Sequence, residues 1–402
     1  MNRMGMIVVL FIGLALGVLM DRLLGVSSDE TVQVVPTETG SETKVSAQPV
    51  RWKLASAYAG SAQLLGTLGH RLVQNLDQTS DGDIKLKFFE PGALVPALEI
   101  FDAVASGSIE AGWATPGFWA GKVPALQLFA AVPFGPAAPE YMAWMYYGGG
   151  RELYDEIYAR HSIKGIPCGI FPPEASGWFR TEITSLDDLK GLKMRFFALG
   201  AKVMEKVGVS TQLLAGGDIF PALELGTIDA TEYASPVIDK DLGFYQIAKH
   251  YYFPGWHQQS TWLDLIINLE KWNGLSPVQQ SQFEMACGDS VRHSIARGEA
   301  IQVPALEFLA EQGFQFHRWS QEFLDAYESA WKEVVTDEVD GDEDFARVWA
   351  SLSEFRNSYS TWHDLGYLQS AVNFLCIDVE FCVGQKESDC FRTYYLFGVV
   401  ER

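Results

Sequence analysis

A short pattern that occurs twice constrains the fold of this chain more than any other feature. The first copy reads Pro96-Ala-Leu-Glu99 followed by Gly107-Ser-Ile-Glu-Ala111, and the second reads Pro221-Ala-Leu-Glu224 followed by Gly226-Thr-Ile-Asp-Ala230. In each copy a helix ends at a glycine, which tolerates the left-handed backbone found after helices, and a short strand follows. Two such copies predict two lobes of related construction, and helix-strand alternation elsewhere indicates an α/β fold. Chance similarity between short motifs is the alternative.

Size and charge limit the function further. The chain has 402 residues, of which 48% are apolar, so it can bury a large core and exceeds the usual size of one domain. Its net charge of −21 argues against nucleic acid or an anionic membrane surface as a partner. The same charge repels an anionic ligand at long range, so binding of an acid requires a local positive centre. The 12 tryptophans fit either a sugar-stacking cleft or, more commonly, core packing.

Arg195 is the best candidate for that positive centre. It lies on a short predicted strand in which Leu192, Met194 and Phe196 share one face, so its side chain points to the other face. A guanidinium matches a carboxylate with two parallel hydrogen bonds, and a nearby Glu232 can hold a hard cation through oxygen. The pattern predicts a site for a small organic acid. An ordinary ion pair between strands is the alternative.

Local signals place several helices. Residues 139–160 form one or two helices around Gly148-Gly-Gly150, and Ser185 caps a short helix with Asp188 three positions later. The last helical zones are expected at 276–330 and 342–352, where charged residues punctuate an apolar periodicity.

Longer motifs carry a resemblance to one known family. The matching segments are Gly191-Leu-Lys-Met-Arg195, Gly216-Gly217, Glu232-Tyr233, Leu242-Gly-Phe-Tyr245, Tyr251-Tyr-Phe-Pro-Gly-Trp256, Gly121-Lys-Val-Pro-Ala125, Ala131-Val-Pro-Phe-Gly135, Tyr147-Gly-Gly-Gly150 and Gly177-Trp-Phe-Arg180. Over residues 51–368 the chain resembles the substrate-binding proteins of TRAP transporters, the tripartite ATP-independent periplasmic carriers. The similarity is to the DctP-type branch of 2-oxo-acid and lactate binders.

The resemblance implies a fold and a division of the chain. The implied fold is a two-lobed α/β architecture, the type II periplasmic-binding-protein fold, with a cleft between the lobes and long C-terminal helices. Its first lobe takes residues 51–173 and part of 261–320, its second lobe 174–260, and the C-terminal helices 321–368. Ligands of α/β sheets bind beyond the carboxyl ends of strands, where Arg195 lies, and the resemblance favours a ligand role for it.

The resemblance also implies a metal beside the substrate. Glu174 stands where relatives carry Gln, Gln258 stands where they carry Glu, and Glu232 matches directly. Tyr233 replaces their usual Trp and is assigned to both substrate and metal. The exchange keeps two carboxylates and one neutral oxygen, a set that suits Na⁺ or Ca²⁺ and does not suit zinc.

One departure concerns the wall of the predicted pocket. Relatives carry a tyrosine pair where this chain reads Thr115-Pro-Gly-Phe118-Trp119. Phe118 then forms an apolar wall against the substrate, which favours a less polar or bulkier acid. Core packing of Phe118 and Trp119 is the alternative.

The two ends of the chain differ from its middle. An apolar run from Met4 to Met20 predicts a signal peptide or a membrane anchor over 1–26, and residues 27–49 read as a flexible tether. Residues 369–402 form an atypical tail that is rich in aromatic and β-forming residues.

Five cysteines, an odd number, leave at least one outside any intramolecular disulfide. In an oxidising compartment some of the others can pair, and the sequence does not fix which.

These observations predict a solute-binding protein without catalytic activity. It captures an organic acid, closes by hinge motion, and delivers the acid to membrane permease subunits. Relatives dimerise through a terminal helix, and residues 355–368 resemble that element; a helix folded onto its own lobe is the alternative. A ligand-sensing module for a receptor, or a carbohydrate-active enzyme with paired carboxylates, are the competing functions.

Overall fold

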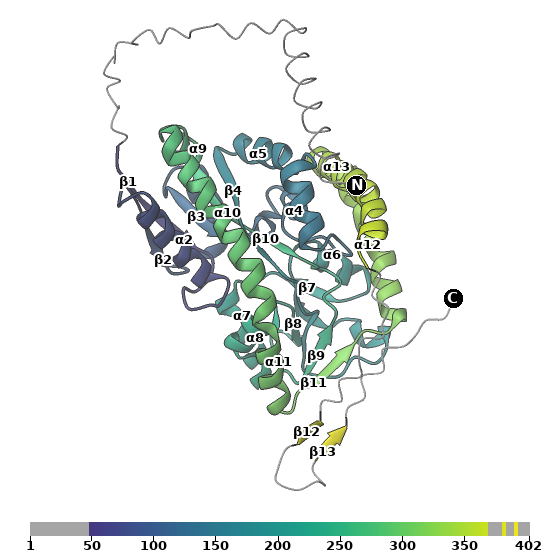
Figure 1. Cartoon of the computed structure of the whole chain (residues 1–402). Helices are drawn as coiled ribbons and strands as arrows, with labels where there is room; N and C mark the ends of the chain where they lie inside the picture. Colours follow the sequence, from purple (N-terminus) through teal and green to yellow (C-terminus); the bar gives the residue numbers. More distant parts are fainter. Residues whose placement is uncertain (1–47, 369–379, 383–389, 393–402) are drawn as a thin grey trace, which may run out of the picture. The chain divides into compact units, whose positions relative to one another are not determined.

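The computed structural model describes residues 48–368, 380–382 and 390–392 (Figure 1). The predicted export segment, all but the last two residues of the predicted tether, and most of the atypical tail lie outside these residues. Within the described ranges, no helix combines the length and apolar character needed to cross a bilayer. In the tail, β12 (Glu380–Cys382) pairs antiparallel with β13 (Cys390–Arg392).

A five-stranded sheet forms the centre of the first lobe. Its strand order is β2 (Ile84–Phe89), β1 (Val50–Ser56), β3 (Ala111–Ala114), β10 (Thr261–Asn268) and β4 (Ile163–Phe171). β1 is parallel to β2 and β3, whereas β10 is antiparallel to both β3 and β4. Every residue of β10 is buried, as expected of a strand covered on both faces.

Helices of this lobe come from the first half of the chain. They are α2 (Gly66–Thr79), η1 (Ala97–Glu99), α3 (Ile100–Ala105), η2 (Pro116–Trp119), η3 (Pro124–Phe129), α4 (Ala138–Tyr147) and α5 (Gly150–Arg160). The prediction of helices broken near Gly148 is confirmed, since α4 ends at Tyr147 and α5 begins at Gly150.

A six-stranded sheet forms the centre of the second lobe. Its order is β11 (Gln315–Arg318), β9 (His250–Phe253), β5 (Gly177–Phe179), β8 (Ala230–Thr231), β6 (Lys193–Arg195) and β7 (Ser210–Gln212). Its helices are η4 (Leu186–Leu189), α6 (Ala198–Lys206), α7 (Gly216–Leu225), α8 (Pro236–Leu242) and η5 (Phe244–Gln246). η4 begins with the predicted capping box of Ser185 and Asp188.

Long helices connect the two lobes. After α9 (Leu269–Asn273), α10 (Pro277–Ala300) packs along β4 and α2 and leads to α11 (Gln302–Glu311), which packs on α8 (Figure 1). The long helical zone predicted over 276–330 is present as α10, α11 and the start of α12, but β11 interrupts it. Gly313, with a left-handed φ of 80°, turns the chain away from the direction of α11. The backbone that follows pairs with β9 at the sheet edge.

The C-terminal helices contact both lobes. α12 (Gln321–Gly341) packs on α6 of the second lobe, and α13 (Glu343–Gly366) packs on η3, α4 and α5 of the first. Ion pairs reinforce both contacts: Lys206 bonds Asp337 on α12 at 2.8 Å, and Arg347 on α13 bonds Glu156 at 2.7 Å. α13 extends well beyond the predicted 342–352.

A disulfide joins Cys168 of β4 to Cys287 of α10, a pairing that the sequence left open. Both cysteines are fully buried, and the bond closes a loop across 119 positions. Covalent closure of a long loop reduces the conformational entropy of the unfolded chain and so stabilises the folded state. The bond fastens α10 to the strand that leads toward the second lobe.

A buried carboxyl group lies in the first sheet. Asp264 of β10 is inaccessible to solvent and accepts hydrogen bonds on Oδ2 from the hydroxyls of Tyr154, at 3.1 Å, and Tyr158. Burial raises the pKa of Asp264 to about 7, although the two hydroxyls oppose the rise.

We expect Asp264→Asn to flatten the dependence of stability on pH. The folded state holds the proton of Asp264 to about pH 7, whereas the unfolded chain releases it near pH 3.8. The stabilisation from this group is therefore complete below pH 3.8 and is lost as the pH rises toward 7. In this window the wild-type free energy of unfolding should fall, relative to the variant, by up to about 1.4 kcal/mol per pH unit. Urea unfolding at several pH values measures it, with exposed Asp325→Asn as control; parallel curves for wild type and Asp264→Asn would contradict the prediction.

Candidate functional site

The two segments by which the chain crosses between the sheets lie side by side. The N–H of Glu174, after β4, donates to the carbonyl of Gln258, and the N–H of Gly255 donates to the carbonyl of Glu174 at 3.0 Å. A Cβ atom at position 255 would lie 2.2 Å from that carbonyl oxygen, so only glycine permits the contact. The crossing segments therefore form one fixed frame between the lobes.

A small cavity lies against this frame and takes its walls from both lobes. It offers about 30 Å³ to the centres of water molecules, which is room for only a few atoms. The residues that line it are Tyr58, Leu65, Thr115, Phe118, Phe171, Glu174, Arg195, Phe197, Tyr233, Ala234, Gln258, Thr261 and Leu263. One side is thus aromatic and aliphatic, and the other carries charges and amide groups.

Arg195 is almost fully buried at the end of β6. Its Nη1 donates to the Oε2 of Glu232 at 2.8 Å and to the carbonyl of Glu232 at 2.5 Å, and the N–H of Glu232 donates back to the carbonyl of Arg195. The Tyr233 ring lies 5.0 Å from the guanidinium carbon. The sequence offered two interpretations of Arg195, an ion pair between strands or a residue of the pocket. In the structure Arg195 forms the ion pair and also lines the cavity.

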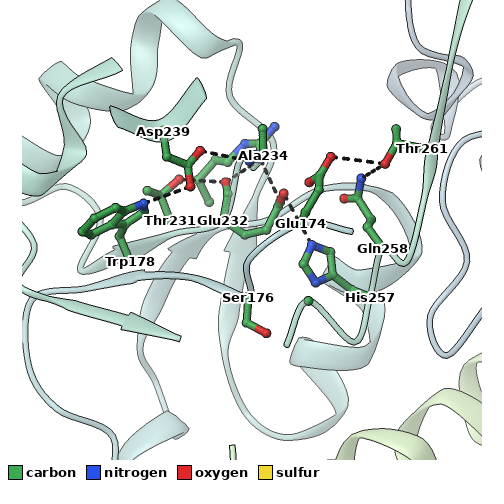
Figure 2. A network of polar contacts seen from close by, with 12 residues as sticks. Glu174, Ser176, Trp178, Thr231, Glu232, Ala234, Asp239, His257, Gln258 and Thr261 are labelled. Carbon is green, nitrogen blue, oxygen red and sulfur yellow. Dashed lines mark hydrogen bonds and ion pairs between the residues drawn. The ribbon is translucent and has the colours of Figure 1, made fainter. Parts of the chain in front are cut away.

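Buried oxygen atoms that have no hydrogen-bond partner in the described part of the chain gather beside this pair. They are Oε2 of Glu174, Oε1 of Glu232 and Oε1 of Gln258 (Figure 2). Ligand atoms of Glu174, Glu232 and His257 all lie within 4.8 Å of one another. Because unpartnered buried oxygens are costly, such a cluster is a fit receptor for a cation.

His257 belongs to the cluster although the sequence reading did not select it. Its Nε2 lies 3.5 Å from the Oε1 of Glu232, and neither ring nitrogen has a hydrogen-bond partner among the described residues. Its position directly before Gln258, a predicted site residue, was the one feature of the sequence that could have identified it.

The two glutamates respond oppositely to their surroundings. Burial, together with the charges of Glu232 and Asp239, raises the pKa of Glu174 well above its usual range. Burial also opposes ionisation of Glu232, but Arg195 and then His257 outweigh it and lower the pKa of Glu232. Glu232 is therefore the permanent anion, and Glu174 requires either a proton or a cation.

Asp239 supports the loop that follows Glu232. It is fully buried on α8 and accepts hydrogen bonds from the Trp178 indole at 2.9 Å and the N–H of Ala234 at 3.1 Å (Figure 2). It also accepts one from the Tyr251 hydroxyl at 2.8 Å. Burial raises the pKa of Asp239 to about 8, although the Tyr251 and Trp178 bonds oppose the rise.

The structure brings together every residue predicted for the site. Arg195, Glu174, Phe118, Tyr233 and Gln258 line the cavity, and Glu232 lies behind it, paired with Arg195. Their roles toward substrate and metal stay predictions. Phe118 packs against Tyr58 and Phe197 with ring centroids 5.9 and 5.5 Å apart, so it is both a wall of the cavity and part of the apolar core.

Comparison with known proteins gives a consistent result. The family model described as "Bacterial extracellular solute-binding protein, family 7" (DctP) matches residues 56–341. A monocarboxylate 2-oxoacid-binding periplasmic protein of Nostoc sp. is 33% identical over 346 residues, which cover 85% of this chain and 94% of that protein.

Solved structures agree in fold. A TRAP transporter solute-binding protein of Bordetella bronchiseptica, a dimer with copurified calcium and picolinate, is 33% identical with a TM-score of 0.77, covering 79% of this chain and 94% of that one. A TRAP periplasmic solute-binding protein of Pseudoalteromonas atlantica, with bound sodium and pyruvate, is 29% identical with a TM-score of 0.76, covering 79% and 97%. The predicted two-lobed α/β fold is confirmed.

We expect Glu232→Gln and Glu174→Gln to differ in their effect on stability. Glu232→Gln leaves the buried Arg195 without its anion and should cost about 3–5 kcal/mol of unfolding free energy. Glu174→Gln resembles the neutral form that its surroundings favour, and should change stability by no more than about 1 kcal/mol. Urea unfolding at pH 7 with a chelator present measures both; equal losses would contradict the opposite ionisation of the two groups.

Proposed function

This chain belongs to family 7 of the bacterial extracellular solute-binding proteins, and on that premise we propose that it captures a small organic acid for a TRAP transporter. The observation that carries the proposal is the cavity between the lobes, where Arg195 is buried beside unpartnered oxygens of Glu174 and Gln258. Within the described residues, Arg195 uses Nη1 and Nε in internal hydrogen bonds, which leaves Nη2 to receive a carboxylate.

The cavity favours a short monocarboxylate of the 2-oxo or 2-hydroxy type. The space that it offers to the centres of water molecules, about 30 Å³, favours a small acid. Phe118, Phe171 and Leu263 line the apolar side and suit a short alkyl group, while Arg195 suits the carboxylate. The named 2-oxoacid ligands of the Nostoc relative and the pyruvate of the Pseudoalteromonas structure support this class.

A cation fits beside the substrate. Glu174, Glu232 and Gln258 each offer a buried oxygen without a partner, Tyr233 adjoins them, and oxygen donors suit Na⁺ or Ca²⁺. When bound, the cation would neutralise the carboxylates and complete its shell with substrate oxygens. Charge favours Ca²⁺: two ionised glutamates, Arg195 and a monocarboxylate leave two negative charges, which one Ca²⁺ cancels. Na⁺ would require one further proton on Glu174.

Capture, delivery and export complete the proposal. The lobes close on the acid without chemical change, and membrane permease subunits receive it. The relatives' periplasmic names support export from the cytoplasm, with residues 1–26 as signal or anchor. A sensor module that presents the same ligand to a receptor remains the second candidate; a gene encoding a receptor kinase beside this one would favour it over a permease.

Arg195→Lys should weaken pyruvate binding by about 1.5–3 kcal/mol. The lysine keeps the charge but loses the planar fork, in which Nε and Nη1 form internal hydrogen bonds while Nη2 is left to donate to the acid. Isothermal titration calorimetry in the presence of Ca²⁺ measures the affinity. Arg180→Lys, in the same lobe but away from the cavity lining, is the control. Unchanged affinity of a folded Arg195→Lys protein would refute the assignment.

Removal of Na⁺ and divalent ions should abolish most pyruvate binding, and addition of Ca²⁺ should restore it. Without a cation, Glu174 and Glu232 repel the anionic ligand. Elemental analysis of the purified protein should find one metal per chain, and Glu174→Gln should lower its retention. Equal pyruvate affinity in metal-free and metal-replete buffer, with no metal in the protein, would reduce the site to a salt-bridge cluster.

The protein should form a homodimer through the end of α13. Trp362 is 60% exposed, Leu365 83% and Leu368 97%, an apolar surface that a partner copy would cover. Light scattering at micromolar concentration should give the dimer mass, measured with and without residues 369–402. Trp362→Asp should give a monomer; a monomeric wild-type protein would contradict this interface.

A further inference from the structure

Phe197 extends from the second lobe to the first across the cavity. It follows β6 by two positions, and its ring contacts η2 of the first lobe, with Phe118 edge-on at a centroid distance of 5.5 Å. Phe197 is 5% exposed and lines the cavity, so its ring separates the bound acid from solvent on this side. The contact exists only when the two lobes are together.

Gly117 is the surface against which this ring packs. A Cβ atom at position 117 would lie 2.3 Å from Cζ of Phe197 and 2.9 Å from its Cε1, closer than real side-chain contacts. Gly117 does not have a left-handed φ, so its backbone would accept another residue. The absence of a side chain at position 117 therefore serves the approach of Phe197.

The backbone around Phe197 is held in an unusual conformation. The next residue, Ala198, has a φ of 48°, in the left-handed region that non-glycine residues rarely adopt. Such strain persists where surrounding contacts impose it, and it commonly marks functional segments. The backbone amide of Phe197 lies near enough to the Glu232 carboxylate to contribute to lowering its pKa.

We propose that Phe197 is a positioning residue, an aromatic latch that seats over Gly117 and holds the lobes closed when the Arg195–Glu232 site is filled. The inference rests on the proposed function. The new element is the residence time of the acid. Both the groups that bind the carboxylate and the ring of Phe197, which touches the opposite lobe, set this time. Weakening the latch should therefore change the rate of ligand release more than the rate of capture.

Gly117→Ala tests the latch, because the added methyl group occupies the place of the ring. Gly121→Ala is a matched control: it lies just after η2, has no left-handed φ, and its added Cβ meets no atom within 4 Å. In stopped-flow tryptophan fluorescence with saturating Ca²⁺, Gly117→Ala should release pyruvate about tenfold faster, the scale of an overpacked contact. The control should match wild type within twofold.

A double-mutant cycle separates the latch from packing inside the first lobe. The new methyl would also lie 3.1 Å from the Cβ of Ala130, which belongs to the same lobe. If the clash is with Phe197, Phe197→Leu makes room, and Gly117→Ala should then have little further effect on release. Two outcomes would overturn the latch while leaving the proposed function intact. One is an equal effect of Gly117→Ala on the release rate in the wild-type and Phe197→Leu backgrounds; the other is equal release rates from Gly117→Ala and Gly121→Ala. Failure of the wild-type protein to bind pyruvate with Ca²⁺ would overturn the proposed function and the latch together.

Discussion

The buried pair of Arg195 and Glu232 is the interaction on which the site depends. A guanidinium removed from water is tolerated only beside an anion with good hydrogen bonds, and Glu232 provides both its carboxylate and its carbonyl. The pair is fixed by β6 and β8, whose parallel register sets Arg195 opposite Thr231, directly before Glu232. Since Glu232 already neutralises Arg195, the site carries an excess of negative charge whenever the adjacent Glu174 is ionised.

In the proposed function, a negative charge on Glu174 would make the site selective. An anionic acid would then bind best together with a cation, while a cation alone would leave the Nη2 donor of Arg195 without a partner. Each ligand therefore improves the site for the other, and their binding should be thermodynamically coupled. The frame that holds Glu174 is rigid, because Gly255 packs directly on its carbonyl and the disulfide of Cys168 ties β4 to α10. In the proposed function the second lobe closes against this frame, and the proposed latch at Phe197 adds a contact between the lobes.

The sequence predicted the parts whose signals are local or carried by long motifs. The two lobes followed from a repeated helix-strand pattern, and Arg195, Glu174 and Gln258 followed from the family resemblance. The edge strand β11 was missed because its four residues show no burial periodicity and only pair with β9 in space. The disulfide pairing was not predicted, because the separation of Cys168 and Cys287 along the sequence does not show that they are close in space. Asp239 gave no signal, since its three donors come from β5, β9 and the loop before α8.

The structure also offers a physical account of the exchange of Glu and Gln at positions 174 and 258 that the family resemblance implies. The hydroxyl of Thr261 lies between them: it accepts from Nε2 of Gln258 at 2.6 Å and donates to Oε1 of Glu174 at 3.2 Å. A hydroxyl can both donate and accept, so the same chain of bonds runs equally well in reverse, from Gln at 174 to Glu at 258. In either arrangement one oxygen of each side chain stays unpartnered, as Oε2 of Glu174 and Oε1 of Gln258 are here. The implied exchange would therefore keep the charge and the number of oxygen atoms beside Glu232, because one hydroxyl can serve either arrangement.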